Sequence, residues 1–374
     1  MMPSRKFVLF AALCRIIVGI TFIFSGFVKA VDPWGTALKV NEYLSIYGIE
    51  ALQPASMIFS IWLCGAELMM GCMLTFRVRT RLISIFALIS MTFFTILTFL
   101  SATWIPVEDC GCFGDALKLT PWETFLKNLL ILPLVVVVWL RHRHQRILDF
   151  SRLEIALTAL FCTFAMGVGT YCYYHLPLID FLPYKVGANI YSMIEEQHDT
   201  GHDAMSEEEY VLIYRNRRTG KLREFKIDDT EWQDESKWEW VETRVDNESS
   251  PIQTLVSEFT ITDVEGDVTR EILTHSGDMF LICVTSFDKL SERSHKNLSE
   301  VVTHAQSEGA EVICLTPQPL REVTYHSFGD NHPVRCYNID ATVMKTMLRA
   351  ESGLVWLRDG VIQGKYNSRN IDMK

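Results

Sequence analysis

Five long apolar stretches constrain this chain more than any other feature of its sequence. They are residues 7–28, 55–76, 82–103, about 125–140 and 155–176. A helix needs roughly 20 residues to cross the hydrocarbon core of a bilayer. The fourth stretch is the weakest, because Lys127 lies near its start and Pro133 in its middle. A lysine can snorkel to the interface, and a proline kink is tolerated where neighbouring helices satisfy the freed carbonyl. We therefore expect five transmembrane helices.

The fourth helix has a clear start signal in Thr120-Pro121-Trp122-Glu123. Threonine is a good N-cap, proline fits the first turn where no N–H is needed, and Glu123 stands where it completes a capping box. The sequence thus predicts that this helix begins just before the apolar stretch.

The charge balance divides the chain into two unlike parts. Residues 1–175 hold 14 Lys and Arg against 10 Asp and Glu, a net charge of +4. The whole chain has 35 basic and 45 acidic residues, which leaves 21 and 35, a net charge of −14, for residues 176–374. An apolar basic part joined to an acidic polar part excludes a single soluble globule. The absence of a basic patch also argues against a nucleic-acid partner.

The basic residues near the apolar stretches predict the orientation in the membrane, because cytoplasmic loops are enriched in Lys and Arg. They gather before the first stretch and in the second and fourth connections: Arg5, Lys6, Arg77, Arg79, Arg81, Arg141, Arg143, Arg146 and Arg152. The other connections contain Lys29, Lys39 and Lys118. We expect a cytoplasmic N-terminus, with everything after residue 176 on the far side. In a bacterium this is the periplasm, and the protein would lie in the inner membrane.

The region after the fifth stretch has the pattern of a folded α/β domain. Residues 210–227 alternate around Arg218-Thr219-Gly220 and predict a β-hairpin, and residues 228–250 are acidic and are interpreted as a linker or a loop that faces a partner. Further on we predict strands at 259–263, at 279–285 and at 311–315, and helices at 290–307 and 341–350. A further strand is predicted to follow the Gly266-Asp267 turn and to end at residue 273. A hairpin closes the chain around Asp359-Gly360.

This order of elements resembles a thioredoxin-like domain over residues 258–374, but its redox residues are missing. Where thioredoxins carry Cys-x-x-Cys, this chain reads Ser286-Phe-Asp-Lys-Leu-Ser-Glu292, and Ser352 stands where the family has its cis-proline. Without a thiolate no exchange chemistry is available there. Cys283, Cys314 and Cys336 are expected to be buried strand residues, since free cysteine packs as a small hydrophobe.

The strongest local signal is the segment Asp109-Cys110-Gly111-Cys112-Phe113-Gly114-Asp115 in the third connection, on the exported side. Gly111 permits the backbone bend that two such close cysteines need, and a ring this small removes little chain entropy, so a disulfide here would be weakly held and oxidising. Neighbouring carboxylates oppose this role by raising the thiol pKa. The alternatives are a static disulfide or tight loop pair, and a metal site. Metal is disfavoured because two thiols with no nearby histidine supply too few ligands.

Arg15 and Glu67 are charged residues well inside the predicted helices. Counting about 1.5 Å per residue from the cytoplasmic ends places Arg15 ~12 Å and Glu67 ~15 Å deep, so they could meet on adjacent helices. An ionisable residue in hydrocarbon is costly and indicates either a functional site or an ion pair that fixes the register of two helices.

At these residues the membrane part resembles the DoxX-like and MauE (methylamine utilisation) family of small four-helix membrane proteins, over about residues 7–140. The first helix carries Gly19-x-x-Phe22-x-x-x-Gly26-x-x-Lys29, and the cysteine segment is followed by Trp122-Glu-Thr-Phe-Leu-Lys127-Asn128. The resemblance implies membrane redox work, disulfide maturation or a quinone-linked oxidoreductase, with Cys110 and Cys112 as the redox pair. Lys29, Asp115 and Lys127 are implied as supporting residues, and a quinone as the cofactor.

The sequence therefore predicts a DoxX/MauE-like four-helix transmembrane domain (1–150), a fifth transmembrane helix (151–177), an exported linker with a hairpin (178–257) and a degenerate thioredoxin-like domain (258–374). Two functions remain open. In one, Cys110 and Cys112 support thiol–disulfide exchange with a periplasmic protein client. In the other, the cysteine pair is structural, and the protein is a non-enzymatic assembly factor whose soluble domain recruits a partner.

Overall fold

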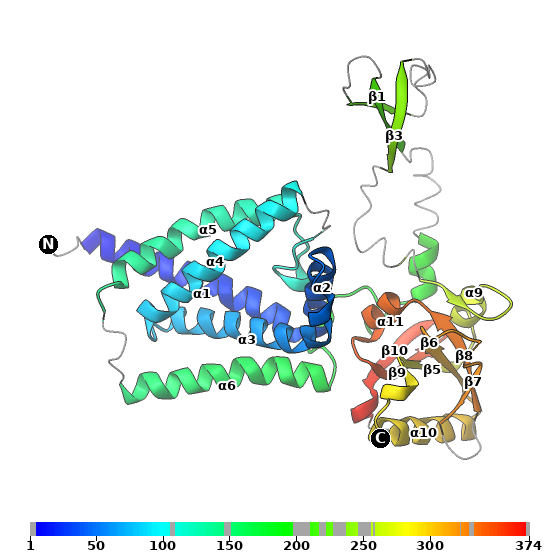
Figure 1. The fold of residues 1–374 in the computed structure, drawn as a ribbon. Helices are drawn as coiled ribbons and strands as arrows, with labels where there is room; N and C mark the ends of the chain where they lie inside the picture. The colour runs from blue at the N-terminus through cyan, green and yellow to red at the C-terminus, as the bar shows by residue number, and fades with distance from the viewer. Residues whose placement is uncertain are drawn as a thin grey trace.

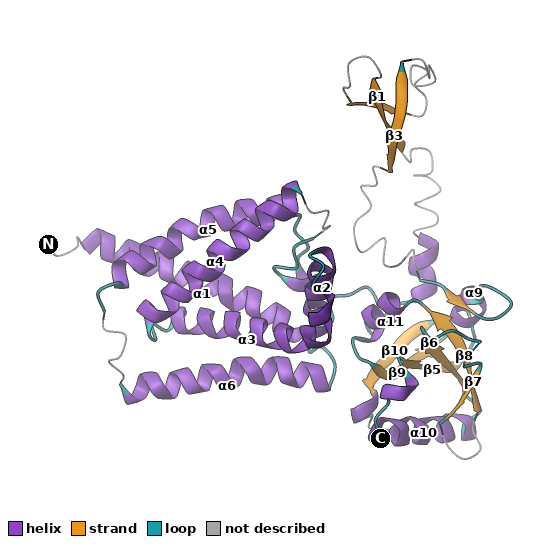
Figure 2. Ribbon diagram, in the orientation of Figure 1, coloured by secondary structure: helices purple, strands orange, loops and turns teal. Residues whose placement is uncertain are grey.

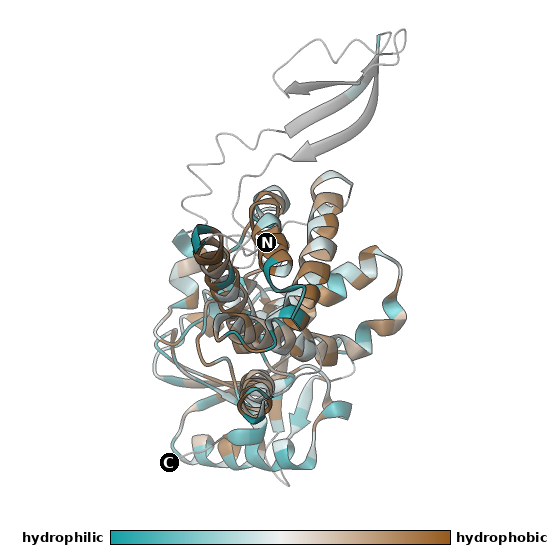
Figure 3. Ribbon diagram, turned by 90° about the vertical axis from the view of Figure 1, so that its left-hand side faces the viewer, coloured by the Kyte–Doolittle hydropathy of each residue, from teal (hydrophilic) through white to brown (hydrophobic). Residues whose placement is uncertain are grey.

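A computed structural model describes residues 5–104, 109–145, 151–196, 210–216, 222–226, 237–245, 256, 259–321, 323–328 and 333–371. The chain forms a bundle of long helices at one side and a mixed α/β domain at the other, with a three-stranded sheet between them in sequence (Figure 1). Figure 3 shows the difference in composition: hydrophobic residues predominate along the bundle helices, and hydrophilic residues are more frequent in the α/β domain. The predicted division into a helical bundle and a separate domain is confirmed at this level.

All five predicted apolar helices are present in the bundle. Its elements are α1 (Arg5–Val31), α2 (Pro33–Ile46), the 3₁₀ helix η1 (Glu50–Ala55), α3 (Ser56–Thr75), α4 (Thr80–Thr103), the 3₁₀ helix η2 (Gly114–Ala116), α5 (Pro121–His142) and α6 (Arg152–Tyr174). The spans of α1, η1 with α3, α4, α5 and α6 are long and apolar enough to cross a membrane. The protein is thus a multi-pass membrane protein. Helix α2 was not predicted, and it lies across the end of the bundle that faces the α/β domain (Figure 1).

Helices α1 and α3 form the closest pair, because three glycines remove the side chains between them. A Cβ atom on Gly26 would lie 2.3 Å from the backbone nitrogen of Leu68, and one on Gly71 would lie 2.4 Å from that of Ile23. Gly19 meets Thr75 in the same way. Small residues at a helix interface let the two backbones approach closely. These contacts fix the register of α1 against α3.

The starts of α5 and α6 are both closed by capping boxes. Thr120 accepts a hydrogen bond from the backbone N–H of Glu123, and the Glu123 carboxylate accepts one from the Thr120 N–H. Ser151 and Glu154 repeat the arrangement at α6. Each cap satisfies N–H groups that the first turn of a helix leaves without partners. The predicted capping box at Thr120 is confirmed.

The three-stranded sheet has the order β2-β1-β3, with every neighbouring pair antiparallel. Its strands are β1 (Tyr210–Asn216), β2 (Leu222–Lys226) and β3 (Trp238–Val245). The first two form the predicted hairpin. The third corrects the interpretation of residues 228–250 as a linker, because part of that acidic segment pairs along β1.

The C-terminal domain contains a seven-stranded mixed sheet with helices on both faces (Figure 2). The strands run in the order β10-β9-β5-β6-β8-β4, with β7 paired to β8, and β5, β6 and β8 are parallel. The elements are β4 (Ile261–Thr262), α9 (Thr269–Leu273), β5 (Asp278–Val284), η4 (Phe287–Lys289), α10 (Glu292–Ser307), β6 (Glu311–Thr316), β7 (Tyr325–Ser327), β8 (Pro333–Ile339), α11 (Ala341–Leu348), β9 (Ser352–Arg358), β10 (Val361–Asn367) and η5 (Ser368–Asn370).

Most of the predicted order is confirmed, with one error. The predicted strand–helix–strand unit is β5-α10-β6, the next helix is α11, and the closing hairpin is β9-β10. The segment up to Leu273 was predicted as a strand but forms the short helix α9, whose first turn is held by the Asp267 carboxylate accepting from the Thr269 N–H at 2.8 Å. Strands β7 and β8 were not predicted.

The sheet separates two hydrophobic cores. One contains Val343, Met344 and Met347 of α11 together with Cys283 of β5, and the other contains Leu298 and Val301 of α10 with Cys314 and Cys336. The three strand cysteines are at most 2% exposed, as predicted. They are therefore packing residues of the domain.

Candidate functional site

The cysteine pair lies in the connection between α4 and α5, in a loop bent by two glycines. Gly111 and Gly114 have φ angles of +61° and +53°, which favour glycine over other residues. The Asp109 carboxylate accepts from the Gly111 N–H at 2.9 Å, and the Gly114 N–H donates to the Gly111 carbonyl at 3.1 Å. The loop thus turns back on itself around the two thiols.

The two cysteines are present as free thiols with raised pKa values. Burial raises the pKa of Cys110 to about 11, and the neighbouring Cys112 and Asp109 add to this effect. Burial also raises the pKa of Cys112, but there the ammonium groups of Lys127 and Lys29 act in the opposite direction. These two cations favour a thiolate at Cys112, although burial together with Glu67 and Asp109 keeps its pKa raised.

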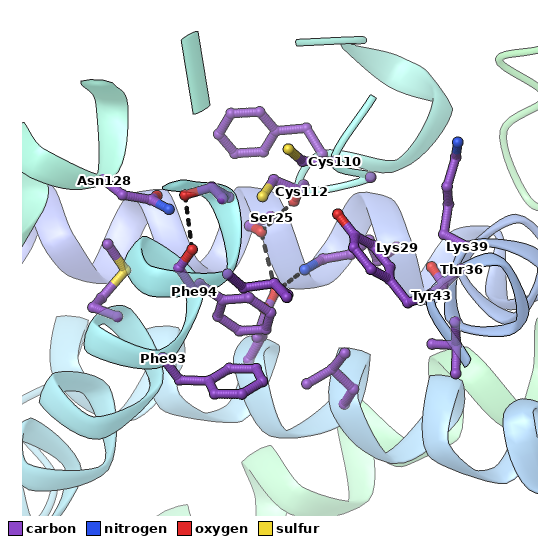
Figure 4. A pocket seen from close by; sticks show the side chains of 18 of the residues that line it. Ser25, Lys29, Thr36, Lys39, Tyr43, Phe93, Phe94, Cys110, Cys112 and Asn128 are labelled. Carbon is purple, nitrogen blue, oxygen red and sulfur yellow. Dashed lines mark hydrogen bonds and ion pairs between the residues drawn. The ribbon is translucent and has the colours of Figure 1, made fainter. Parts of the chain in front are cut away.

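The thiols border a cavity of about 330 Å³ inside the bundle (Figure 4). Its apolar wall comes from α1, α3, α4 and α5 and contains Phe22, Leu63, Met91, Phe93, Phe94, Leu97 and Ile131. Its polar atoms come from the cysteine loop, from α2 and from a few bundle residues. The cavity has the size and mixed lining of a site for a small organic molecule.

A buried ion pair between Lys29 of α1 and Glu67 of α3 borders this cavity. Both side chains are 6% exposed. The Ser25 hydroxyl lies 3.0 Å from the Glu67 carboxylate and 2.7 Å from the Cys112 carbonyl oxygen, so its one hydrogen can be donated to either. This chain of contacts connects the ion pair to the backbone of the cysteine loop.

Two residues of α5 contribute polar groups to the cavity lining. The Lys127 ammonium lies 4.1 Å above the ring centre of Phe113, a cation–π contact. Asn128 is 3% exposed, and its amide nitrogen has no hydrogen-bond partner among the residues that the structure describes. An amide donor buried without a partner is costly, which makes it a candidate to bind an acceptor group in the cavity.

The structure corrects the predicted meeting of Arg15 with Glu67. Glu67 pairs with Lys29, whereas the Arg15 guanidinium donates to the carbonyl oxygens of Leu74 and Thr75, the latter at 2.6 Å. The glycine contacts set Gly26 beside Glu67 and Gly19 beside Thr75, so Arg15 lies at the very end of α3. A cation there satisfies the last carbonyls of the helix and its dipole.

Asp115, the last residue of the cysteine segment, is joined to the C-terminal domain. The Arg349 guanidinium lies 2.5 Å from the Asp115 carboxylate and 2.9 Å from that of Asp32, the N-cap of α2. The structure thus brings Cys110, Cys112, Lys29, Lys127, Glu67 and Asp115 to one end of the bundle, and leaves Arg15 at the other.

Sequence reasoning missed Ser25, Asp32 and Arg349 as members of this site. The signal for Asp32 was available, because Asp-Pro is a typical start of a helix. Nothing in the sequence near Arg349 connects it with the cysteine loop. Within the described ranges, no group of three or more His, Cys, Asp or Glu side chains is placed to hold a metal ion.

Fold and site together define a multi-pass helical membrane protein with a thiol pair in the lining of a bundle cavity and a separate α/β domain. Residues 7–141 match the sequence model of the family described as methylamine utilisation protein MauE. This match supports the MauE-like resemblance of the membrane part, which was expected over about residues 7–140.

A curated relative is Protein TlpB of Flavobacterium psychrophilum, with 28% identity over 130 residues. The match covers 33% of this chain and 35% of the relative, so the chain spans about a third of the length of the curated relative it matches. No solved structure matches the chain.

Proposed function

We propose that this chain is a membrane thiol–disulfide oxidoreductase in which Cys110 and Cys112 are the redox pair. The observation that carries the proposal is the presence of both thiols in the lining of the apolar cavity, with two lysines beside Cys112. The MauE-like resemblance of residues 7–141 supports it.

The chemistry balances with an acceptor that dissolves in the bilayer. Forming the Cys110–Cys112 disulfide breaks two S–H bonds, forms one S–S bond and releases two electrons and two protons. A quinone bound in the cavity would take up the two electrons and two protons and become a quinol. The cavity's aromatic and aliphatic wall suits an apolar ring, and the Asn128 amide is a free donor for a carbonyl oxygen.

The residues of the chain have distinct roles in this step. Lys127 and Lys29 favour the Cys112 thiolate, which is the group released when a client thiolate attacks Cys110 of the disulfide. The Ser25 hydroxyl connects the Lys29–Glu67 pair to the backbone of the cysteine loop. The resulting disulfide would then be exchanged with two thiols of a protein client, which form a disulfide while Cys110 and Cys112 return to thiols.

Two further proposals concern place and partner. The basic residues at the Arg77–Arg81 end support a cytoplasmic N-terminus and an exported cysteine loop, as in a bacterial inner membrane with its periplasm. We interpret residues 258–374 as a thioredoxin-like domain without its cysteines, next to the exported mouth of the bundle.

The redox state of Cys110 and Cys112 in intact membranes tests the proposal. In membranes that contain quinone the pair should be oxidised, and removal of quinone should leave it reduced. A Cys112→Ser variant should accumulate mixed disulfides between Cys110 and a client. Cys162→Ser is the matched control, because Cys162 lies exposed on α6 away from the cavity lining. This function is refuted if the redox state of the pair does not respond to quinone and the Cys112→Ser variant traps no client.

A second candidate is a non-enzymatic assembly protein, favoured by the ion pairs that tie the cysteine loop to the C-terminal domain. The two functions separate cleanly. If Cys110→Ala and Cys112→Ala preserve function while deletion of residues 258–374 abolishes it, the cysteines are structural and the second candidate is correct.

A further inference from the structure

Arg349 leaves its own domain and enters the membrane bundle. It follows α11 in the C-terminal domain, and its side chain is 4% exposed. Its guanidinium lies between the carboxylates of Asp32 and Asp115, at 2.9 and 2.5 Å. Asp115 is 234 positions away in the sequence, in the loop that holds the two cysteines.

The backbone at Arg349 adopts a left-handed conformation at the end of α11. Arg349 has a φ of +55°, and its N–H donates to the Lys345 carbonyl at 2.8 Å, which closes the end of α11. This left-handed position at a helix end is usually occupied by glycine, which adopts it without strain. At Arg349 the backbone is in a conformation that is strained for a residue other than glycine, and the guanidinium contacts Asp32 and Asp115 of the bundle.

The bundle has a matching space for the guanidinium. A Cβ atom on Gly35, in the first turn of α2, would lie 2.7 Å from the Asp32 carboxylate, 2.9 Å from the Asp115 carboxylate and 3.2 Å from the guanidinium of Arg349. The glycine therefore leaves room for all three groups. The left-handed backbone of Arg349 and the absence of a side chain at Gly35 thus both allow this ion cluster to form.

Other contacts hold the two parts together but involve the region around the end of α6. The Asn367 amide donates to the His175 carbonyl at 2.9 Å, and the Asn370 amide donates to the Tyr174 carbonyl at 2.8 Å. Lys365 pairs with Asp180. The Arg349 cluster adds a direct connection to the cysteine loop.

The loop is thus anchored at both of its ends by ion pairs. At the first end, Asp109 lies 3.1 Å from the Lys39 ammonium of α2. At the second end, Asp115 is held by Arg349. Between the anchors the chain passes through Gly111 and Gly114, whose freedom would otherwise let the thiols change position.

We propose that Arg349 is a positioning residue of the redox site, which holds Cys110 and Cys112 over the cavity through Asp115. The C-terminal domain is then a fixed part of this site and not a free arm that recruits a partner. The effect on redox chemistry rests on the function proposed above, but the effect on the position of the thiols does not.

The test compares full-length Arg349→Met, Arg349→Lys and Arg358→Met in native membranes. Arg358 is the matched control, because its guanidinium is half-exposed and pairs with Asp278 inside the C-terminal domain. The first readout is the rate at which a maleimide alkylates the reduced thiols at positions 110 and 112. The second is the equilibrium of the pair with a dithiol–disulfide buffer of known potential.

We expect Arg349→Met to change the alkylation rate and the dithiol–disulfide equilibrium about tenfold each, the latter being about 30 mV for a two-electron couple. Arg349→Lys should restore part of both, and Arg358→Met should leave both at the wild-type value. If Arg349→Met does not insert in the membrane, Gly35→Ala serves as the second variant, since it disturbs the same cluster with Arg349 in place.

Wild-type values of both readouts in Arg349→Met and in Gly35→Ala would overturn the proposal. Failure of the proposed function looks different: the wild-type pair would then be indifferent to quinone, while the alkylation rate would still respond to Arg349.

Discussion

The buried Lys29–Glu67 pair allows a quantitative test of the site inside the membrane. Both side chains are 6% exposed, and the pair is in contact with the cysteine loop through Ser25. Removing one partner of a buried pair leaves an uncompensated charge, which costs ~3–5 kcal/mol. Replacing both charged side chains by uncharged ones of similar volume often leaves the free energy of unfolding nearly unchanged. The single and double variants should therefore differ strongly.

We expect Glu67→Gln and Lys29→Met each to lower the free energy of unfolding by ~3–5 kcal/mol, and the double variant to lower it by less than ~2 kcal/mol. The assay is unfolding of the purified protein in lipid bicelles by increasing amounts of a denaturing detergent, followed by circular dichroism. Glu50→Gln is the control, because Glu50 is exposed in η1 and should change stability by at most ~0.5 kcal/mol.

Additive losses in the double variant would refute the reasoning, because two independent residues add and a coupled pair does not. Losses below ~1 kcal/mol in both single variants would contradict the burial of the pair.

Three more predictions follow from the structure. Gly26→Ala should destabilise the bundle by ~1–3 kcal/mol, because the added Cβ meets backbone atoms of Leu68, whereas Gly167→Ala, with nothing within 4 Å, should be neutral or slightly stabilising in the same detergent assay. Alkylation of Cys110 in a Cys112→Ser variant should keep accelerating with pH beyond the ordinary thiol pKa of ~8.5, because burial, the largest cause of the raised pKa of Cys110, remains in the variant, while the denatured protein should level off above ~8.5. Since the pKa of Cys110 is higher in the folded state, its contribution to stability is present below the unfolded pKa and is lost as the pH rises toward 11. Thr120→Ala should cost ~1 kcal/mol of stability by removing the cap of α5, and an unchanged unfolding midpoint would contradict this.

The transmembrane helices were predictable because length and hydrophobicity alone define them. Helix α2 was not, since residues 33–46 are too short to span a bilayer and mix polar with apolar side chains. Helix α9 was predicted as a strand because five residues contain too little periodicity to distinguish the two. The hydrophobic pattern identifies a helix when it extends over several turns, but it cannot distinguish a helix from a strand over a single turn.

The relative positions of the charged bundle residues and their partners could not be predicted from the sequence. Counting residues from the helix ends gave Arg15 and Glu67 similar depths. The register of α1 against α3 is set by the close contacts at Gly19, Gly26 and Gly71, and it places Lys29 at Glu67. Glycine spacing was visible in the sequence, but which α3 residues each glycine meets depends on the packing of both helices.

The candidate site combines residues that the sequence holds far apart. The motif residues from Cys110 to Asp115 and Lys127 are neighbours in the chain, and the family resemblance brought them together. Arg349 belongs to another domain, and only the folded chain places it on Asp115. The residue was also inconspicuous, because a left-handed φ leaves no signature in the sequence when glycine is absent.

The two cysteines are not equivalent, and the difference gives the site a direction. Cys110 lies beside the hydroxyl groups of Thr124 and Tyr43, which stabilise a thiolate less than a full positive charge does. Cys112 lies beside two ammonium groups, and its backbone carbonyl is a neighbour of the Ser25 hydroxyl. A thiolate therefore forms more readily at Cys112 than burial alone would allow. In the proposed reaction Cys112 is therefore the sulfur that reacts with the quinone in the cavity. Cys110 is the sulfur that forms the mixed disulfide with the client.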